Sequence, residues 1–227
     1  MSLIQTAPAL ADQVYEAIFD EICSGRLTPG THLKQEQLAG QFGVSRQPVQ
    51  QAMALLKADG LIEEVGKRGL RVSHLDIDTM HHHYEVRALL DGLAARNATT
   101  RIAGDEATGK VFEKHARAIL DAGTRAVNKG DVPEMVRQDE AFHRLFYETS
   151  GNPLLAHTAE PHWRFLRRVM GDVLRDAEPP HDIWNQHAAI VAAALEGDPA
   201  RTERLMREHA TRAAQLLASN SKVDAGQ

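Results

Sequence analysis

The sequence has few of the features that mark secreted or membrane proteins. Its one cysteine, Cys23, excludes an intramolecular disulfide. It also has no long uninterrupted apolar run of the kind that forms a signal peptide or a membrane-spanning segment. We therefore expect a cytoplasmic protein without a membrane partner. The 227 residues, of which 43% are hydrophobic, can bury a sizeable core and suit two domains.

Positive charge is not in excess either. The formal net charge is −5, and residues 1–74 hold seven lysines and arginines against eight aspartates and glutamates. Net charge governs nonspecific attraction to nucleic acid, so composition predicts only modest nonspecific affinity for DNA. Several basic residues are nevertheless concentrated in one part of this segment, with most acidic residues expected elsewhere. They are Arg46, Lys57, Lys67, Arg68 and Arg71.

Residues 33–61 predict a helix-turn-helix. Leu38 and Phe42 lie one turn apart on the first helix, and Gly43 can supply the left-handed backbone that ends it. Ser45 is expected to begin the second helix, with its hydroxyl accepting a backbone N–H of the first turn. Apolar residues at helical spacing then define the buried face of that helix. They are Val49, Ala52, Met53 and Leu56.

The opposite face of the second helix is polar. It comprises Arg46, Gln47, Gln50, Gln51 and Lys57. Arginine and lysine bind phosphate or guanine, and glutamine can pair with adenine. We therefore predict that this face binds a groove of double-stranded DNA. A solvated helix face is the alternative interpretation.

Residues 61–72 predict a small β-hairpin, because short apolar runs flank a tip bounded by glycines. A hairpin after the second helix makes a winged helix, and Lys67 and Arg68 at the tip suit contact with phosphate. A plain surface hairpin is the alternative. The predicted DNA contacts are Ser45, Arg46, Gln47, Gln50, Lys67 and Arg68.

The rest of the chain shows no clear alternating strand pattern and is expected to be helical. Glycine and proline clusters divide it into predicted helices. These span 76–101, 105–129, 132–149, 153–158, 160–177, 181–196 and 199–219. The predicted fold is therefore mainly α. It comprises a winged helix-turn-helix with a β-hairpin wing over 8–74, a linker over 75–79 and an all-helical bundle over 80–219.

Three of the predicted helices carry polar residues on their inward faces. Asp139 and His143 lie four residues apart on one of them. His187 and His209 fall on the inward lines of two others. Imidazole and carboxylate together suit a divalent metal, with zinc expected first and nickel, manganese or iron as alternatives. Four protein ligands can leave one coordination position open for a small ligand.

Other interpretations of these residues stay open from spacing alone. An inward histidine is often a hydrogen-bonded core residue, and an Asp/His pair at this spacing is often a helical hydrogen bond. A metal-dependent enzyme and a purely structural metal are further alternatives. Six other histidines of the helical part are expected on the surface. They are His81, His82, His83, His157, His162 and His181.

The N-terminal segment contains a set of residues at characteristic spacing. They are Gly25, Leu27–Gly30, Leu38–Ala39, Gly43–Arg46, Pro48–Val49, Leu55, Gly60–Leu61 and Gly69. With them, residues 10–72 resemble the winged-helix domain of the GntR family of bacterial transcription regulators. The family's usual Thr, Arg and Glu are replaced by Gln47, Gln50 and Gln51. The resemblance therefore implies the fold and DNA binding, but not the operator sequence.

A second set lies in the helical part: Glu85, Arg87, Asp139, Phe142–His143, Gly151–Leu154, His187, Ile190, Met206 and His209. With it, residues 80–217 resemble the FCD ligand-binding domain of the FadR-type branch of that family. The resemblance implies metal ligation by Asp139, His143, His187 and His209. It also implies that Arg87 helps to bind a carboxylate effector, with an Arg87–Asp91 ion pair as the alternative. Arg164 and Asn185 are interpreted as surface or structural residues.

These implications combine into one hypothesis. The chain is expected to be a homodimeric transcription regulator, in the first instance a repressor, that binds a palindromic DNA operator. A small organic acid, bound at the metal and Arg87, is expected to shift the two winged-helix domains. An enzyme is not favoured, because Glu140 and Glu208 lie on other helix faces and no general base is evident.

Overall fold

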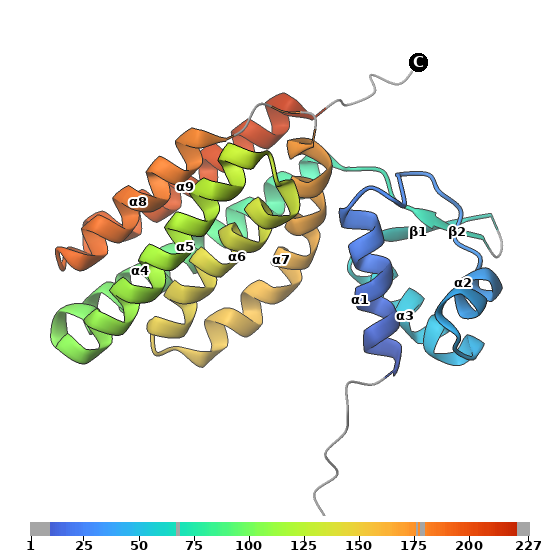
Figure 1. The fold of residues 1–227 in the computed structure, drawn as a ribbon, viewed down its shortest axis with the longest axis horizontal. Helices are drawn as coiled ribbons and strands as arrows, with labels where there is room; N and C mark the ends of the chain where they lie inside the picture. Colours follow the sequence, from blue (N-terminus) through green and yellow to red (C-terminus); the bar gives the residue numbers. More distant parts are fainter. Residues whose placement is uncertain (1–9, 67–68, 176, 178–179, 222–227) are drawn as a thin grey trace, which may run out of the picture. The chain divides into compact units, whose positions relative to one another are not determined.

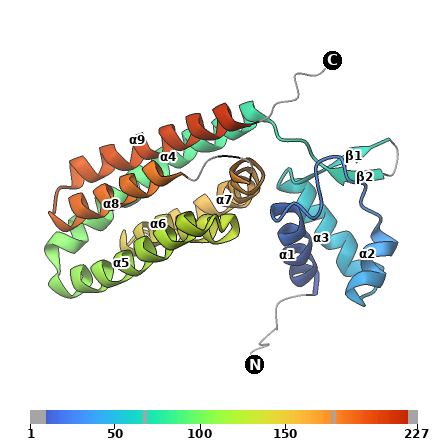
Figure 2. The same cartoon turned by 45° about the horizontal axis from the view of Figure 1, so that its top comes forward.

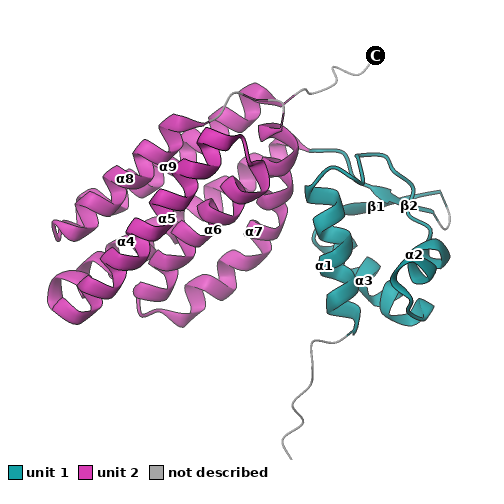
Figure 3. Ribbon diagram, viewed as in Figure 1, with its two compact units in different colours: residues 1–75 teal, residues 76–227 magenta. Residues whose placement is uncertain are grey.

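The computed structural model describes residues 10–66, 69–175, 177 and 180–221. The chain divides into unit 1, residues 1–75, and unit 2, residues 76–227 (Figure 3). The described residues form nine α-helices and one two-stranded sheet, so the protein is mainly α as predicted. Within this described part, no helix is both long and apolar enough to span a lipid bilayer.

Unit 1 consists of three helices and a hairpin (Figure 1). The elements are α1 (Leu10–Cys23), α2 (Gln35–Phe42), α3 (Arg46–Ala58), β1 (Ile62–Val65) and β2 (Gly69–Val72). Helix α1 packs on α3, and Ile18, Phe19 and Leu56 belong to a continuous apolar core. The strands pair antiparallel, with Ile62 opposite Val72. This is the winged helix-turn-helix predicted from the sequence.

The backbone of the turn between α2 and α3 has the conformation predicted from the sequence. Gly43 ends α2 with a left-handed φ of 64°, and the N–H of Val44 donates to the Ala39 carbonyl at 3.0 Å. The predicted capping bond of Ser45 is absent, although Ser45 occupies the N-cap position of α3. Pro48 is the third residue of that helix and has no N–H, which removes a common partner of an N-cap hydroxyl.

Unit 2 is a bundle of six helices. They are α4 (Ile77–Gly104), α5 (Glu106–Lys129), α6 (Val132–Thr149), α7 (Pro153–Leu174), α8 (His181–Leu195) and α9 (Pro199–Asn220). Helix α4 lies beside α9 in both views and also packs against α6 and α7 (Figures 1 and 2). Helix α5 packs on α6 and α8. The inward faces of α4, α6, α8 and α9 therefore share one interior.

Side-chain caps explain why several of these helices begin where they do. Asp131 accepts a hydrogen bond from the backbone N–H of Glu134, and Asp198 accepts one from the N–H of Arg201. Each carboxylate satisfies an N–H group that has no partner within its helix. These caps fix where α6 and α9 begin. They therefore also fix how far along the bundle the inward polar residues of these two helices lie.

Helix α7 differs from the prediction of two helices, 153–158 and 160–177. It is one helix, Pro153–Leu174, with Pro161 inside it. Proline removes one backbone hydrogen bond, which disfavours a continuous helix. Leu155 and Ala159 before it and Trp163 after it are all buried, while Pro161 is exposed. Burial of one continuous face on both sides of the proline outweighs the lost bond.

Candidate metal centre and DNA-binding face

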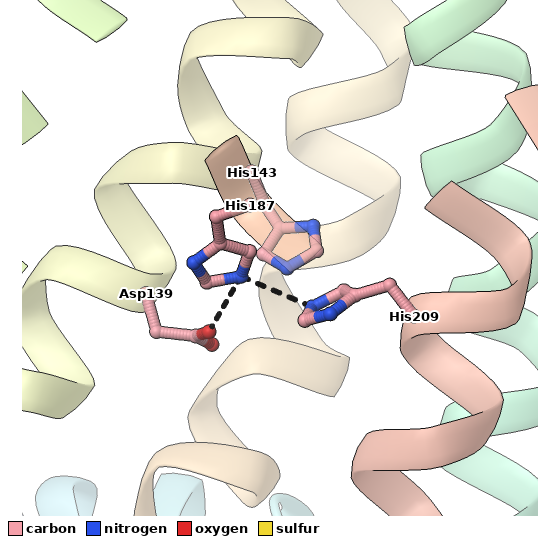
Figure 4. A group of neighbouring side chains, drawn as sticks. All are labelled: Asp139, His143, His187 and His209. Atoms are coloured by element: carbon pink, nitrogen blue, oxygen red, sulfur yellow. Dashed lines mark hydrogen bonds and ion pairs between the residues drawn. The ribbon is translucent and has the colours of Figure 1, made fainter. Parts of the chain in front are cut away.

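Four side chains converge in the interior of unit 2. Asp139 and His143 project from α6, His187 from α8 and His209 from α9 (Figure 4). One ligand atom from each of them can be chosen such that all four lie within 4.8 Å of one another. The structure thus brings together the four residues that the sequence singles out as possible metal ligands.

The contacts within this cluster centre on one nitrogen of His187. Its Nε2 lies 3.3 Å from Asp139 Oδ1 and 3.1 Å from His209 Nε2. The side chains of His143 and His187 are fully buried, and that of Asp139 is 14% exposed. Two imidazole nitrogens this close have room for at most one proton between them, so at least one of them presents a lone pair that could bind a cation.

Burial and neighbouring charges shift the pKa values of Asp139, His187 and His209. Burial lowers the pKa of His187 in spite of the Asp139 carboxylate, and it lowers that of His209 well below the ordinary value, helped by His187 and His143. Burial would raise the pKa of Asp139, but the hydrogen bond from His187 and the neighbouring positive charges hold it below its ordinary value. Neutral imidazoles and an ionised carboxylate are the forms that bind metal.

His187 is spaced from Asp139 and His209 as the ligands of one divalent cation would be, and a ligand atom of His143 lies within 4.8 Å of the other three. Two ligand atoms that each lie about 2.0 Å from a tetrahedral zinc are themselves about 3.3 Å apart. The distances of 3.1 and 3.3 Å from His187 Nε2 are close to that value. The donor set of three nitrogens and one carboxylate oxygen also suits nickel, manganese or iron.

Two polar residues lie at the outer nitrogens of these imidazoles. His209 Nδ1 lies 3.1 Å from Gln186 Oε1 in a hydrogen bond, and His143 Nδ1 lies 3.2 Å from Asp91 Oδ2 as a close contact without hydrogen-bond geometry. Such partners orient the ring of a ligating histidine and fix its tautomer. The sequence interpretation missed both of these roles. Only adjacency to His187 in the sequence could have pointed to Gln186, whereas Asp91 lies on a different helix.

Arg87 is buried at the same place, with 1% of its side chain exposed. Its Nη2 lies 3.1 Å from Asp91 Oδ2 and 3.0 Å from His143 Nε2, and its guanidinium lies 3.8 Å from the centre of the Trp163 ring. The ion pair with Asp91, the alternative interpretation, is thus present. The same arginine also contacts His143 of the four-residue cluster, so the ion pair does not remove it from the site.

The residues around Arg87 keep its guanidinium positively charged. Burial would lower its pKa, but Asp91 raises it above the ordinary value. Burial would likewise raise the pKa of Asp91, and Arg87 with His143 holds it below its ordinary value. Tyr147 donates a further hydrogen bond to Asp91. The interior of unit 2 therefore contains a fixed cation beside the four-residue cluster.

A cavity of about 40 Å³ adjoins this cation. Arg87, Tyr84, Asp139 and His209 line it, together with apolar side chains of α6, α7, α8 and α9. Arg164 and Asn185 do not line it. Asn185 is exposed and Arg164 is half-buried, in keeping with the surface or structural roles expected for them.

Three of the six histidines expected on the surface are not fully exposed. His83 and His162 are half-buried, with their Nδ1 atoms 3.0 Å apart, and His83 stacks on Phe165 at a centroid distance of 4.2 Å. These contacts come from packing of α4 on α7, which helix periodicity alone does not reveal. His81 is also half-buried. The other three of that set, His82, His157 and His181, are exposed as expected.

The polar face of α3 is exposed in unit 1. Ser45, Arg46, Gln47 and Gln50 lie on it, opposite the buried face of that helix. The two other predicted contacts, Lys67 and Arg68, lie outside the described residues.

The separation of basic from acidic residues in unit 1 is smaller than predicted. Lys57 pairs with Glu64 at 2.6 Å, and Arg71 pairs with Glu63 at 2.6 Å. Both acids stand on β1, next to the helix expected to contact DNA. Most acids of unit 1 lie elsewhere, as expected, but these two stand on the wing.

Comparisons with known proteins agree with both units. Residues 10–72 match the family model described as bacterial regulatory proteins, gntR family, and residues 82–212 match the FCD domain. The probable D-xylose utilization operon transcriptional repressor of Paenarthrobacter nicotinovorans is 30% identical, over 97% of this chain and 94% of that one. The HTH-type transcriptional repressor RspR of Escherichia coli is 25% identical, over 87% of this chain and 84% of the relative.

Solved structures support the fold. Escherichia coli McbR/YncC matches with a TM-score of 0.78 and 19% identity, over 94% of this chain and 99% of that one. A putative GntR regulator of Rhodococcus sp. RHA1 matches with a TM-score of 0.76 and 18% identity, over 93% and 99% of the two chains. The chain belongs to the GntR family of bacterial regulatory proteins, carries an FCD domain behind its helix-turn-helix domain, and is a DNA-binding transcriptional regulator rather than an enzyme.

Proposed function

We propose that this regulator is a homodimeric repressor whose operator binding is controlled by a small carboxylate, held at a divalent metal ion in unit 2. The observation that carries the proposal is the polar end of the cavity. There Asp139 and His209, two members of the metal cluster, line the same space as the guanidinium of Arg87. A metal and an arginine facing one cavity suit the two oxygens of a carboxylate.

His143, His187 and His209 are proposed to hold the metal through neutral imidazole nitrogens, and Asp139 through its carboxylate. Zinc is proposed first, with nickel, manganese or iron as alternatives. When bound, the metal would supply an electrophilic site for one oxygen of the effector. Asp91 and Gln186 would keep the rings of His143 and His209 in orientation, as their distances of 3.2 and 3.1 Å support.

Arg87 is proposed to bind the other carboxylate oxygen and to pass the signal on. To do so it must change its contacts with Asp91 and His143, which belong to α4 and α6. Helix α4 begins at Ile77, directly after unit 1 ends at residue 75. A shift of α4 is therefore a direct route from the cavity to the DNA-binding unit. An effector that binds two arrangements with tenfold different affinity shifts their balance by about 1.4 kcal/mol.

DNA binding is proposed to use the exposed face of α3, with Ser45, Arg46, Gln47 and Gln50 at the groove. Lys67 and Arg68 are proposed as phosphate contacts of the wing. A homodimer would present two such faces to a palindromic operator with half-sites roughly 34 Å apart. The ion pairs of Lys57 and Arg71 with wing acids support a need for two half-sites, since they lower the charge available to one unit. The proposed location is the cytoplasm, where the operator is found.

An enzymatic role has no support from the side chains around the cluster. Glu140, the acid next to Asp139 in the chain, pairs with Arg144 at 2.7 Å and Arg167 at 3.5 Å. Glu208, next to His209, pairs with Arg204 at 3.0 Å. A general base needs to reach a metal-bound water, and these two acids face other partners.

The test is operator binding under four conditions, with operator duplexes first selected from random sequence by the purified protein. Fluorescence anisotropy is measured for zinc-loaded and chelator-stripped protein, each with and without carboxylic acids. The proposal expects at least one acid to weaken operator binding by tenfold or more, and only in the zinc-loaded protein. Asp139→Asn should abolish this response, whereas Glu148→Gln, an exposed acid of the same helix, should keep it.

Two other outcomes would contradict the proposal. If stripping the metal lowers thermal stability but leaves the acid response unchanged, the metal is structural. If no acid changes operator affinity in either form, the cluster does not serve effector sensing.

A further inference from the structure

The cavity beside Arg87 has a polar end and apolar walls. The polar groups are those of Tyr84, Arg87, Asp139 and His209. The remaining lining side chains are apolar or aromatic, and Met135, Met170, Ile183 and Leu216 represent the four helices that supply them. A ligand that places its charged group at the polar end must therefore place the rest of its body against hydrocarbon.

The sequence positions of these residues explain the separation. Met135 lies one helical turn before Asp139 in α6, and Ile183 lies one turn before His187 in α8. Ala213 lies one turn after His209 in α9. All three apolar residues line the cavity, so its apolar part lies on one side of the metal cluster.

The cavity has one cationic side chain, Arg87, and that cation already pairs with Asp91. One carboxylate can be matched by Arg87 and a metal together. A second carboxylate would find no cation among the lining residues and would be desolvated against methionine, isoleucine and leucine side chains. Hydroxyl groups along the ligand body would likewise lose hydrogen bonds to water without replacement.

The cavity must also widen before an acid can enter. Its volume of about 40 Å³ holds a few water molecules at most, given the roughly 10–15 Å³ that one water requires. Met135 and Met170 in its wall are unbranched and have three rotatable side-chain bonds, which lets them move aside at low cost. The wall that widens is therefore the apolar one, and the polar end keeps Arg87 as its cation.

We propose that the effector is a monocarboxylate with an unsubstituted aliphatic or aromatic body, rather than a dicarboxylate or a polyhydroxylated acid. This inference rests on the proposed function, since it takes the carboxylate to bind at the metal and Arg87. The polar end then selects for one carboxylate, and the walls of α6, α7, α8 and α9 select for its apolar body. Each buried methylene should raise affinity by about fourfold until the cavity is filled.

The experiment compares three six-carbon acids, hexanoate, adipate and gluconate, on the full-length zinc-loaded protein by titration calorimetry and operator release. The first has a bare chain, the second a further carboxylate and the third hydroxyl groups. Hexanoate is expected to bind at least tenfold more tightly than either of the others and to release the operator. Affinity should also rise from acetate to butyrate to hexanoate.

Two results would overturn the inference in distinguishable ways. Tighter binding and operator release by adipate or gluconate would leave the carboxylate-controlled regulator standing and refute only the apolar body. No binding and no operator release with any acid would refute the proposed function itself, and the inference with it.

Variants of cavity-lining residues test whether the apolar wall binds the body of the acid. Ala213→Leu adds bulk inside the cavity and should weaken hexanoate binding tenfold or more, with acetate binding and zinc content unchanged. Ala189→Leu makes the same substitution at an exposed site of α8. It should leave hexanoate binding, acetate binding and zinc content unchanged. If Ala213→Leu fails to fold, Ile183→Thr lowers the apolar character of the same wall without added volume. Equal losses of acetate and hexanoate in these variants would contradict the assignment of the wall.

Discussion

The two units bury different kinds of residue. In the described part of unit 1, Ser73 is the only buried residue outside the apolar and aromatic ones. Unit 2 buries Arg87, Asp91, Arg168 and three histidines. Buried charge lowers stability unless it is paired and hydrogen-bonded, and such groups concentrate at functional sites. The contrast indicates that unit 1 functions through its surface and unit 2 through its interior.

The largest expected effect tests the buried charge of unit 2. Asp91→Ala removes the partner of Arg87 and leaves a cation without compensation in the interior. The free energy of unfolding of unit 2 should fall by about 3–5 kcal/mol. Urea titration followed by tryptophan fluorescence measures this directly, because both tryptophans of the chain, Trp163 and Trp184, belong to unit 2.

Controls separate charge from packing in that experiment. Glu148→Ala truncates an exposed acid and should change stability by less than about 0.5 kcal/mol. The double variant Arg87→Met, Asp91→Leu replaces both charges by apolar groups. It should recover much of the stability that Asp91→Ala loses. If Asp91→Ala costs no more than Glu148→Ala, the contrast between the two interiors has no energetic basis.

A second prediction concerns packing next to the cavity. A Cβ at position 123 would lie 1.9 Å from the ring of Trp184. The planar ring cannot flex, so the whole indole would have to move. Gly123→Ala should therefore lower the stability of unit 2 by about 1–3 kcal/mol and displace the indole that lines the cavity. Gly109→Ala in the same helix meets only ordinary contacts and should be neutral or stabilising. Equal behaviour of the two variants in urea titrations would refute the close packing.

The surface of unit 1 provides the third prediction. Arg46→Ala should weaken operator binding by about 1–3 kcal/mol, while zinc content and thermal stability stay unchanged. Asp12→Asn, at an exposed position of α1, should leave operator affinity close to that of the wild type. Anisotropy titrations measure both. Undiminished affinity of the Arg46 variant would discredit α3 as the recognition helix.

The smallest effect concerns pH. Burial, and then the charges of His162 and His82, lower the pKa of His83 from 6.5 to about 4. Between these values the unfolded chain binds a proton that the folded chain does not, so acidification from pH 6.5 to 4 should destabilise unit 2. His83→Phe keeps a ring against Phe165 and should make stability less steep in this range. An unchanged slope, relative to the exposed control His157→Asn, would contradict this.

Local sequence signals were sufficient for most of the fold. The spacing of apolar residues, Gly43 and the glycine breaks such as Gly130 determine elements largely by local chemistry, and those predictions match the observed helices. The predictions failed where a residue depends on something else in the fold. Pro48 leaves Ser45 without its capping bond, and packing on both sides of Pro161 keeps α7 continuous.

The candidate site shows the same division. Helix periodicity was enough to indicate that Asp139, His143, His187 and His209 face inward. It could not show that Arg87 contacts His143 while its partner Asp91 accepts a bond from Tyr147, because these contacts join α4 to α6. Nor could it show that Glu63 and Glu64 pair with basic residues of unit 1, since strand register places Glu63 opposite Arg71 and the packing of β1 near α3 brings Glu64 to Lys57.

The most direct test of the account is the metal content of the purified protein. Elemental analysis should find about one divalent metal ion per chain in the wild type and in Glu148→Gln, and little in Asp139→Ala. The metal-loaded wild type should also be stabilised by a monocarboxylate in thermal-shift measurements, whereas the stripped protein should not respond. Metal content that is unchanged in Asp139→Ala, or absent from the wild type even after incubation with zinc, would contradict the proposed metal centre and return its four residues to ordinary polar contacts of the core.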